Sequence, residues 1–213
     1  MKESSLRAPK VGAVDELVSH SIELPSGDEL RVLQPAESAE LPDDGAVEWA
    51  PVAPYWEVLW RSGVVLAREL EDEPLRGLRV VELGCGLGVP SILAARAGAK
   101  VLATDVASEA LELVRRSAEA NGVEVETAVA DWAAPDELVG RGPFDLVLAA
   151  DVLYERAAVA QLLPLLPRVA PVAWLADPGR PAAEAFTEQA RRRGWLVETR
   201  ERGVVQLHRL RFG

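Results

Sequence analysis

A glycine-rich run, Glu82-Leu83-Gly84-Cys85-Gly86-Leu87-Gly88, directly follows the apolar residues Val80 and Val81. Glycines permit a tight turn and let the backbone approach a ligand, with a helix N-terminus behind them. A dinucleotide-binding loop reads G-x-G-x-x-G, but here the third glycine comes one residue early and Glu82 precedes the first. A carboxylate repels a pyrophosphate and can attract an ammonium. The run therefore predicts a site for a cationic ligand at Glu82, Gly84, Cys85, Gly86 and Gly88, with a ligand-free turn as the alternative.

Acidic residues also follow the next three apolar runs. Asp105 comes about 20 residues after the glycines, a spacing that lets a carboxylate accept both hydroxyls of a ribose. Asp131-Trp132 can offer a carboxylate to an adenine amino group and an indole face to its ring, although a buried Trp beside a solvated Asp is the alternative. Asp151 follows Ala150. Each acid alone could be a turn or capping residue, but four in register after successive strands are harder to obtain by chance.

Strand-like and helix-like segments alternate through residues 55–193, so a parallel sheet with helices on both faces must position these acids. The expected strands are 80–83, 100–105, 124–129, 144–149 and 172–176, and the expected helices are 55–70, 91–95, 108–119, one near 136, 157–166 and 181–193. Two further strands, 195–199 and 204–210, are separated only by Glu201-Arg202-Gly203, which forces an antiparallel pair at the sheet edge. The predicted fold is a doubly wound, Rossmann-like α/β domain, whose ligands bind outside the carboxyl ends of the strands.

The chain divides into an N-terminal extension, residues 1–54, and one α/β domain, residues 55–213. Two short alternating runs, 21–24 and 30–33, flank the turn residues Pro25-Ser26-Gly27-Asp28 and predict a β-hairpin in the extension. A length of 213 residues suits one full-sized core plus this extension.

Charge and composition exclude several classes of partner. The formal charge of −11 would repel a nucleic-acid backbone, and the basic run 191–193 is better read as a solvated helix face. One cysteine and two histidines allow neither an intrachain disulfide nor a Cys/His metal site. Without an apolar stretch of about 20 residues or a signal-peptide pattern, we expect a cytoplasmic protein that does not bind membranes. We also expect a monomer or weak oligomer.

Several motifs resemble one family. The run 82–88 resembles the motif I loop of class I (seven-stranded) S-adenosylmethionine-dependent methyltransferases, and Asp105 resembles their ribose-binding acid. Asp151-Val152-Leu153-Tyr154 resembles the D-x-x-Y motif of the family-16 protein methyltransferases, most of whose known members modify lysine. The segment 55–63 is similar to the Trp-rich stretch that precedes motif I in that family. Asp177-Pro178-Gly179-Arg180 is similar to the D-P-G-R element of the electron-transfer-flavoprotein β-subunit lysine methyltransferases and their bacterial relatives.

The resemblance covers about residues 55–180, and it implies a protein lysine methyltransferase that converts S-adenosylmethionine to S-adenosylhomocysteine. Asp151 is then the catalytic residue that orients the acceptor amine, and Tyr154 shapes the channel. Trp60 and Ala150 complete the cofactor-binding set, while Trp56 is equally well a core residue. Arg180 contacts the substrate or ties down its loop.

Two other functions stay open at this point. One is a methyltransferase for a small amine or another metabolite, because related sequences can share the cofactor half and differ in the acceptor. The other is a cofactor-binding scaffold without catalysis, or a nicotinamide oxidoreductase, against which the early third glycine argues. Residues 1–50 match no motif, and substrate choice can reside there.

Overall fold

A seven-stranded sheet in the order β5-β4-β3-β6-β7-β9-β8 forms the centre of the computed structural model, which describes residues 16–38 and 55–213. The strands β3 to β7 are parallel, and β9 runs antiparallel to both of its neighbours, β7 and β8. Their bounds are β3 Arg79–Leu83, β4 Lys100–Asp105, β5 Glu126–Val129, β6 Leu146–Ala150, β7 Val172–Asp177, β8 Trp195–Arg202 and β9 Val205–Phe212. The predicted parallel sheet with an antiparallel C-terminal hairpin at one edge is confirmed.

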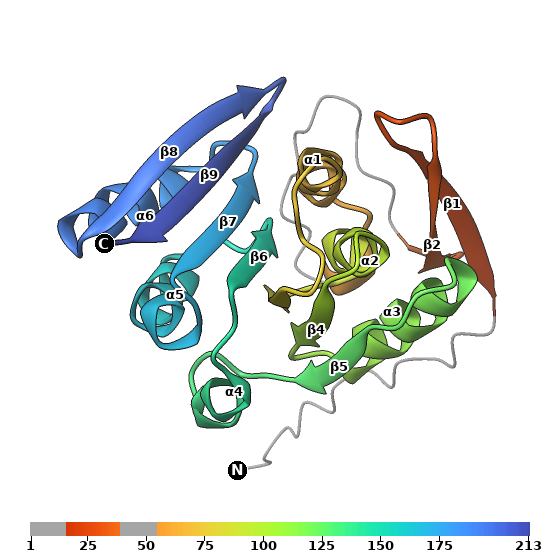
Figure 1. Cartoon of the computed structure of the whole chain (residues 1–213), viewed down its shortest axis with the longest axis horizontal. Coiled ribbons are helices and arrows are strands. Elements are labelled where there is room, and N and C mark those ends of the chain that lie inside the picture. Colours follow the sequence, from red (N-terminus) through yellow and green to blue (C-terminus); the bar gives the residue numbers. More distant parts are fainter. Residues whose placement is uncertain (1–15, 39–54) are drawn as a thin grey trace, which may run out of the picture.

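Helices cover both faces of this sheet, as expected for a doubly wound fold (Figure 1). One face packs against α1, α2 and α3 and the other against α4, α5 and α6. The helices are α1 Arg61–Leu70, α2 Val89–Arg96, α3 Ser108–Ala120, α4 Asp136–Arg141, α5 Arg156–Val169 and α6 Pro181–Arg192. In α5 the buried residues Val159, Leu162, Leu163 and Leu166 recur at the spacing of one helix face, which turns that face to the sheet.

The central strands β3 and β6 are buried over 80–83 and 146–149 because helices cover them on both sides, and Glu82 is the one charged residue in these stretches. They are hydrogen-bonded neighbours, yet the chain leaves β3 toward β4 and leaves β6 toward β7. The strand order therefore reverses between them, and the crevice at their carboxyl ends is where ligands bind in folds of this kind. The glycine run follows β3, and Asp151 follows β6.

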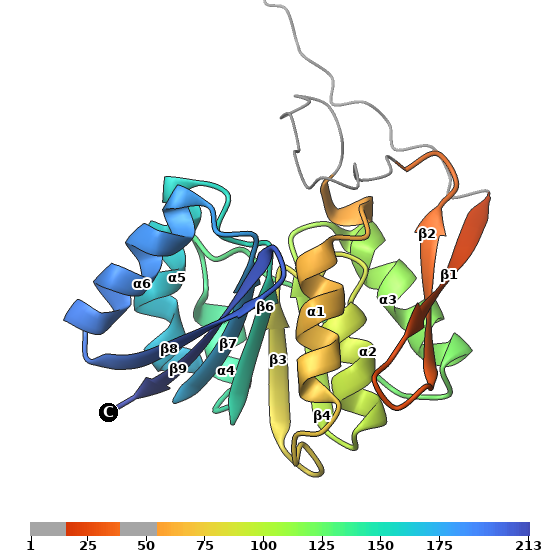
Figure 2. The same cartoon turned by 90° about the horizontal axis from the view of Figure 1, so that it is seen from above.

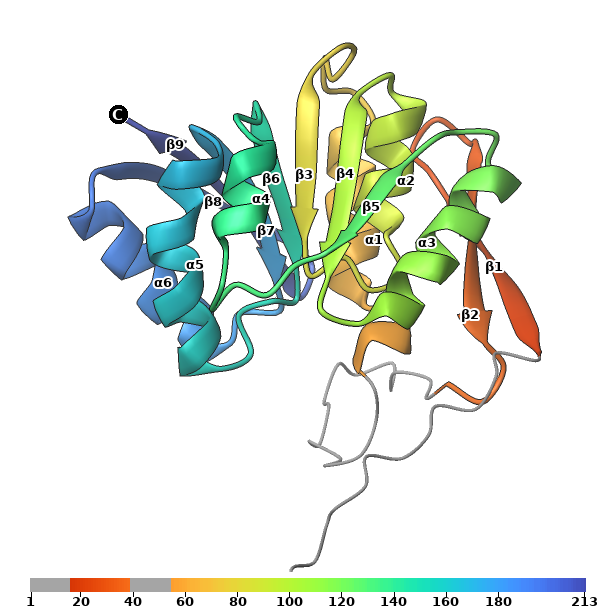
Figure 3. The ribbon, with the colours of Figure 1, turned by 90° about the horizontal axis from the view of Figure 1, so that it is seen from below.

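A separate N-terminal hairpin, β1 (Leu17–Glu23) and β2 (Glu29–Pro35), stands beside α3 (Figure 2). Its register pairs Ile22 with Leu30, and Gly27 occupies the turn with a φ of +88°. Leu30 and Val32 are fully buried in the core formed with α1 and α2. The predicted hairpin is confirmed. It packs against α3 and α2, outside the helix layer on that side of the sheet (Figure 3).

The entry to the first α-helix differs from the prediction. We expected Trp56 and Trp60 on one helix, but Trp56 lies in a 3-10 turn, η1 (Tyr55–Glu57), and α1 begins only after Trp60. The reason is local, because the Trp60 indole Nε1 donates to the Tyr55 carbonyl oxygen at 2.9 Å and Trp60 itself has an extended backbone. The helix α3, by contrast, begins at Ser108, where the sequence predicts it.

The described residues contain no helix long and apolar enough to cross a bilayer. In the same part of the chain, no three His, Cys, Asp or Glu side chains gather as a metal site would require.

Candidate active site

The glycine run forms a tight loop between β3 and α2. Gly86 and Gly88 have φ values of +50° and +71°, in the left-handed region that favours glycine. A Cβ atom on Gly88 would lie 2.7 Å from Cγ2 of Val114 in α3, and one on Gly86 would lie 3.1 Å from the Trp56 carbonyl oxygen. Glycine is thus required here both by the backbone conformation and by the close packing of α3 and η1 on the loop.

Glu82 lies beneath this loop rather than on its rim. Only 1% of its surface is exposed, and its Oε2 accepts hydrogen bonds from the Ser91 backbone N–H at 2.9 Å and from the Ser91 hydroxyl. Burial raises the pKa of Glu82 to about 8; the Ser91 hydrogen bonds oppose this shift, and the nearby Asp105 adds to it. The sequence predicted a free carboxylate at this position. The structure shows a buried carboxyl group that already caps the first turn of α2.

Asp105 at the end of β4 is also buried, and both of its oxygens face the loop region. Oδ2 accepts from the Gly86 N–H and Oδ1 from the Ala107 N–H, each at 3.0 Å. A carboxylate oxygen has two lone pairs, so each oxygen can still accept a hydrogen bond from a ligand hydroxyl. The geometry is therefore compatible with a diol, as the spacing predicted.

Asp131 and Trp132 follow β5 on the other side of the loop. Asp131 is exposed, and its Oδ1 accepts from the Ala133 N–H at 2.8 Å. The half-buried Trp132 ring lies close to Gly84, where an added Cβ would meet Cζ2 of the indole at 3.2 Å. An aromatic face and an acceptor thus stand together at this end of the site.

Cys85 is buried within the loop, and burial raises the pKa of its thiol well above the usual range, with Glu82 and Asp105 adding to the shift. A thiol that stays protonated is a poor nucleophile. Cys85 is therefore a small residue of the loop rather than a nucleophile.

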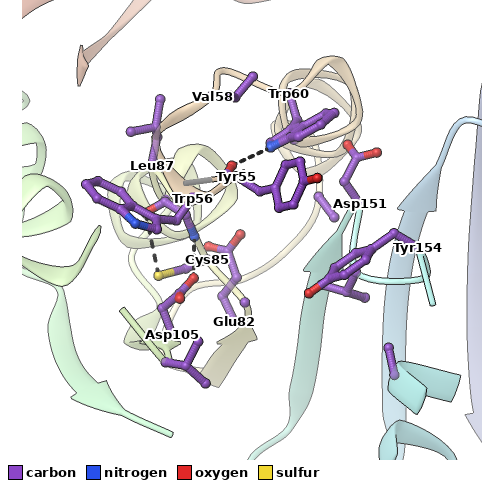
Figure 4. Close-up of a pocket in the computed structure, with 18 of the residues that line it drawn as sticks. Tyr55, Trp56, Val58, Trp60, Glu82, Cys85, Leu87, Asp105, Asp151 and Tyr154 are labelled. Carbon is purple, nitrogen blue, oxygen red and sulfur yellow. Dashed lines mark hydrogen bonds between the residues drawn. The ribbon is translucent and has the colours of Figure 1, made fainter. Parts of the chain in front are cut away.

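All of the predicted site residues line one cavity of about 450 Å³, a volume in the range typical of small-molecule sites. They are Trp60, Glu82, Gly84, Cys85, Gly86, Gly88, Asp105, Asp131, Trp132, Ala150, Asp151 and Tyr154. Figure 4 shows Glu82, Cys85 and Asp105 on one side of this cavity and Asp151 and Tyr154 on the other. The cavity is also lined by four residues of the segment before α1, which are Tyr55, Trp56, Val58 and Leu59.

Asp151 is the one non-glycine residue with positive φ, +58°, in the part of the chain that the structure describes. Its side chain is 6% exposed, and its Oδ1 accepts from Arg180 Nη1 at 2.8 Å. Its Oδ2 is buried and has no hydrogen-bond partner among the described residues. Burial raises the pKa of Asp151, while the Arg180 guanidinium and the Ser62 hydroxyl oppose that shift. A strained backbone that presents an unpaired carboxylate oxygen is typical of a functional position.

Arg180 joins two strand ends through one guanidinium. Its Nη1 also contacts Asp177 Oδ2 at 2.9 Å, and its backbone N–H donates to Asp177 Oδ1 at 2.7 Å. The guanidinium carbon lies 5.9 Å from the centre of the Trp60 ring. Arg180 therefore ties down its loop and holds Asp151 at the same time. We had assigned no role to Asp177; the available signal was an acid at the end of β7, on the same edge of the sheet as Asp105.

Three aromatic rings surround the Asp151 end of the cavity. The Tyr55 ring lies 6.5 Å from that of Trp60 and 6.4 Å from that of Tyr154, centre to centre. Trp60, predicted for the cofactor, thus lies beside Arg180 and Asp151 (Figure 4). Tyr55 is not among the predicted site residues, although it begins the segment 55–63, which resembles the Trp-rich stretch before motif I.

A second cavity, of about 890 Å³, adjoins the first and shares Tyr55, Trp60, Tyr154 and Arg180 with it. Its remaining walls come from the first turns of α5 and the loop and first turns of α6. They are Arg156, Val159, Ala160, Pro178, Gly179, Pro181, Ala182, Ala185 and Gln189. We call it the outer groove. The shared residues mark the boundary where a group in the inner cavity can meet one in the outer groove.

Known proteins share both the sequence and the fold. A family model described as lysine methyltransferase matches residues 55–173. The electron transfer flavoprotein beta subunit lysine methyltransferase of Xenopus laevis is 39% identical over 120 residues, which are 54% of this chain and 46% of that protein. The histone-arginine methyltransferase METTL23 of Xenopus laevis is 36% identical over 152 residues, 68% of this chain and 62% of that protein. The matches thus span about half to three fifths of these relatives.

Among solved structures, the T. thermophilus 16S rRNA N2 G1207 methyltransferase RsmC, in complex with AdoMet and guanosine, aligns with a TM-score of 0.63. The alignment covers 92% of this chain and 51% of that one at 18% identity, which shows a shared fold. The family match, by contrast, covers more than half of the chain and includes both the glycine loop and the Asp151–Tyr154 motif. The chain therefore belongs to the lysine methyltransferase family.

Proposed function

We propose that this protein transfers the methyl group of S-adenosylmethionine to the amino group of a lysine side chain in a protein substrate. The observation that carries the proposal is the junction of the two cavities at Asp151. Asp151 lines the inner cavity and has one buried oxygen without a hydrogen-bond partner among the described residues, and Arg180, which holds its other oxygen, lines both cavities.

The inner cavity fits the cofactor part by part. Asp105 can accept the ribose hydroxyls, and Trp132 with Asp131 can contact the adenine. Gly84, Gly86 and Gly88 allow the backbone to approach the methionine portion, and Glu82 supplies a negative charge beneath it when ionised. When bound, the cofactor supplies a methyl group on a positively charged sulfur atom, ready for in-line displacement.

The acceptor nitrogen must be neutral to attack. For a lysine with a pKa near 10.4, this costs about 4 to 5 kcal/mol at neutral pH. An isolated carboxylate would raise that pKa further, but Arg180 lies against Asp151 and offsets its charge. Asp151 Oδ2 then acts as a hydrogen-bond acceptor that orients the amine rather than as a strong base. The lysine ammonium would first release one proton to solvent. With the cofactor bound, the new carbon–nitrogen bond would replace the carbon–sulfur bond of the sulfonium, and S-adenosylhomocysteine would leave.

Tyr55, Trp60 and Tyr154 line both cavities, so their rings would flank an acceptor side chain that reaches Asp151 from the outer groove and would limit its contact with water. Alignment of the nucleophile and exclusion of water are the main requirements of methyl transfer. We propose that the lysine side chain enters from the outer groove, with its backbone lying across the first turns of α5 and α6.

An arginine acceptor is a second candidate, because one relative is named a histone-arginine methyltransferase. A guanidinium presents several N–H donors in a planar fork, which suits a pair of carboxylate oxygens. Asp151 Oδ1 already accepts from the Arg180 guanidinium, whose positive charge would repel a second guanidinium at the same carboxylate. This favours an acceptor that reacts as a neutral amine.

Calorimetry with S-adenosylhomocysteine and with NAD tests the cofactor, and we expect binding of the first alone. Incubation of a host lysate with isotopically labelled S-adenosylmethionine, followed by mass spectrometry, identifies the acceptor. Methyl groups on lysine are the expected result. Labelled arginine would support the second candidate, and labelled metabolites without labelled protein would contradict both.

We further propose that the protein acts in the cytoplasm as a monomer or weak oligomer. The single cysteine and the absence of an apolar span in the described residues support the compartment. Light scattering of the purified chain tests the oligomeric state.

A further inference from the structure

The segment of residues 55–60, which we call the roof, closes the inner cavity over the glycine loop. It contributes Tyr55, Trp56, Val58, Leu59 and Trp60 to the cavity wall, and it has only one 3-10 turn of regular structure. The Trp56 carbonyl oxygen is the atom nearest to a Cβ added at Gly86. Small shifts of the roof would therefore change the shape of the cavity directly.

Gln34, at the end of β2, holds the roof from outside. Its side chain is buried, with 6% of the residue exposed, and Nε2 donates to the Glu57 carbonyl oxygen at 2.8 Å. Glu57 lies between the roof residues Trp56 and Val58, both of which line the cavity. A buried amide on the hairpin is thus bonded to the backbone of the cavity wall.

The hairpin is itself fixed to the helices of the domain. The Leu33 N–H donates to the Ser117 hydroxyl of α3 at 3.0 Å. The Asn121 amide, just after α3, accepts from the Arg31 N–H at 2.9 Å and donates to the Arg31 carbonyl oxygen at 2.6 Å. At the turn, Arg96 of α2 donates to the Glu29 carbonyl oxygen at 2.9 Å. Gln34 therefore reaches the roof from a rigid support.

The hairpin does not contact either cavity directly. None of the described residues 16–38 lines the inner cavity or the outer groove. It also precedes the region that the family model matches, which begins at residue 55. The Gln34–Glu57 hydrogen bond therefore gives the hairpin a direct link to the cavity wall, on the side of the cofactor. The hairpin's other side-chain hydrogen bonds to the domain go to α1, α2 and the C-terminal end of α3.

We propose that Gln34 is a positioning residue that sets the roof for cofactor binding. The inference rests on the proposed function, since it takes the inner cavity as the cofactor site. Glu57 lies between Trp56 and Val58, which line the inner cavity but not the outer groove, so the inference assigns the hairpin to cofactor affinity. Loss of the Gln34 bond leaves the Glu57 carbonyl oxygen unpaired and the roof free to shift.

The test compares Gln34→Met, which keeps the length and bulk of the side chain but removes the donor, with Arg96→Met. The second variant removes a hydrogen bond from a side-chain nitrogen to the hairpin backbone, together with the Arg96–Asp28 ion pair, at the end away from the roof. We expect Gln34→Met to raise the calorimetric Kd for S-adenosylhomocysteine roughly tenfold. The KM for the cofactor should rise with it while kcat changes little. Arg96→Met should stay within about twofold of wild type even if both variants lower Tm.

Hydrogen exchange gives a second readout. Amides of residues 55–63 should exchange faster in Gln34→Met than in Arg96→Met. If Gln34→Met fails to fold, Gln34→Asn, whose amide cannot span the same distance, takes its place in the comparison. A Gln34 variant that binds like wild type, or two variants that weaken binding equally, would overturn the inference. Failure of the wild-type protein to bind S-adenosylhomocysteine would instead overturn the proposed function.

Discussion

At the level of single residues, Asp151 combines an unusual backbone with an unusual charge environment. Its φ of +58° places it in a region that Asp and Asn tolerate better than other non-glycine residues. One oxygen is held by Arg180, and the other is buried and free. The same residue therefore combines strain, burial and an open acceptor at the junction of the two cavities.

Replacement of Asp151 by Asn should separate catalysis from cofactor binding. Asn keeps the left-handed backbone accessible and the volume nearly unchanged, but it removes the charge. We expect methyl transfer to fall by a factor of about 100 or more, while the Kd for S-adenosylhomocysteine changes by no more than about threefold. Asp145→Asn, just before β6 at the opposite end of that strand, is the matched control and should retain activity. Equal losses of turnover and of cofactor binding in Asp151→Asn would contradict its assigned role.

Glu82 should make the stability of the protein depend on pH. In the unfolded chain this carboxyl group titrates near its ordinary pKa of 4.5, whereas in the fold its pKa is raised to about 8. The folded state therefore holds one more proton between these values, so the free energy of unfolding falls as pH rises through this window and levels off above it. The decrease is of the order of 3 to 5 kcal/mol.

Urea unfolding at about pH 5.5 and about pH 8 measures this decrease in the free energy of unfolding. Glu82→Gln, which can still accept from the Ser91 N–H, should remove most of the decrease and be relatively more stable at the higher pH. Glu119→Gln, an exposed position on α3, is the control and should behave like wild type. If wild type and Glu82→Gln show the same pH dependence, Glu82 is not protonated in the fold.

At the level of elements, the glycine loop is closed by two neighbours: η1 lies on one side and α3 on the other. Its backbone conformation and its packing are separate constraints. Gly122, after α3, offers a direct comparison, because it has a similar φ of +68° but nothing within 4 Å of an added Cβ.

Gly88→Ala should therefore be more damaging than Gly122→Ala. Both substitutions force alanine into the left-handed region, which costs about 1 to 2 kcal/mol. Gly88→Ala adds a clash with Val114, worth roughly 1 to 3 kcal/mol more, and should also weaken cofactor binding. Urea unfolding and calorimetry measure the two effects. The double variant Gly88→Ala, Val114→Ala should regain part of the loss, and equal effects at both glycines would show that packing on α3 does not matter.

At the level of the whole molecule, a charge of −11 bears on the choice of partner. The structural relative RsmC acts on 16S rRNA, but its likeness to this chain is one of fold. A fold of this kind serves many acceptors, so charge and site decide between them. Acidic proteins repel phosphate backbones over distances set by the ionic strength.

We therefore expect no measurable retention of total tRNA or rRNA fragments in filter binding at about 0.15 M salt, even at micromolar protein concentrations. A basic protein, by contrast, should be methylated faster at low salt than at high salt, because opposite charges favour encounter. Measuring RNA retention and the rate of methylation of the basic protein over a range of salt concentrations checks the prediction. RNA binding with a steep salt dependence would show a local basic face that overrides the net charge.

The fold class and most of the site followed from the sequence because both depend on local patterns. Alternation of strands and helices implies a parallel sheet, and parallel strands bring their carboxyl ends to one edge. Residues placed directly after those strands, such as Asp105 and Asp151, must then converge whatever the details of packing. All of the predicted site residues do line one cavity.

Only the tertiary structure decided which of these residues touch. Gln34 donates to the Glu57 backbone carbonyl oxygen, and Arg180 donates to the carboxylates of Asp151 and Asp177; each of these hydrogen bonds is about 3 Å long. Periodicity fixes the face on which a residue lies, but it does not fix a side-chain direction or a loop path to that accuracy. The same limit placed Trp60 on a helix and Glu82 on an open rim. In the fold, an indole hydrogen bond holds Trp60 ahead of α1, and burial against Ser91 makes Glu82 a cap for α2.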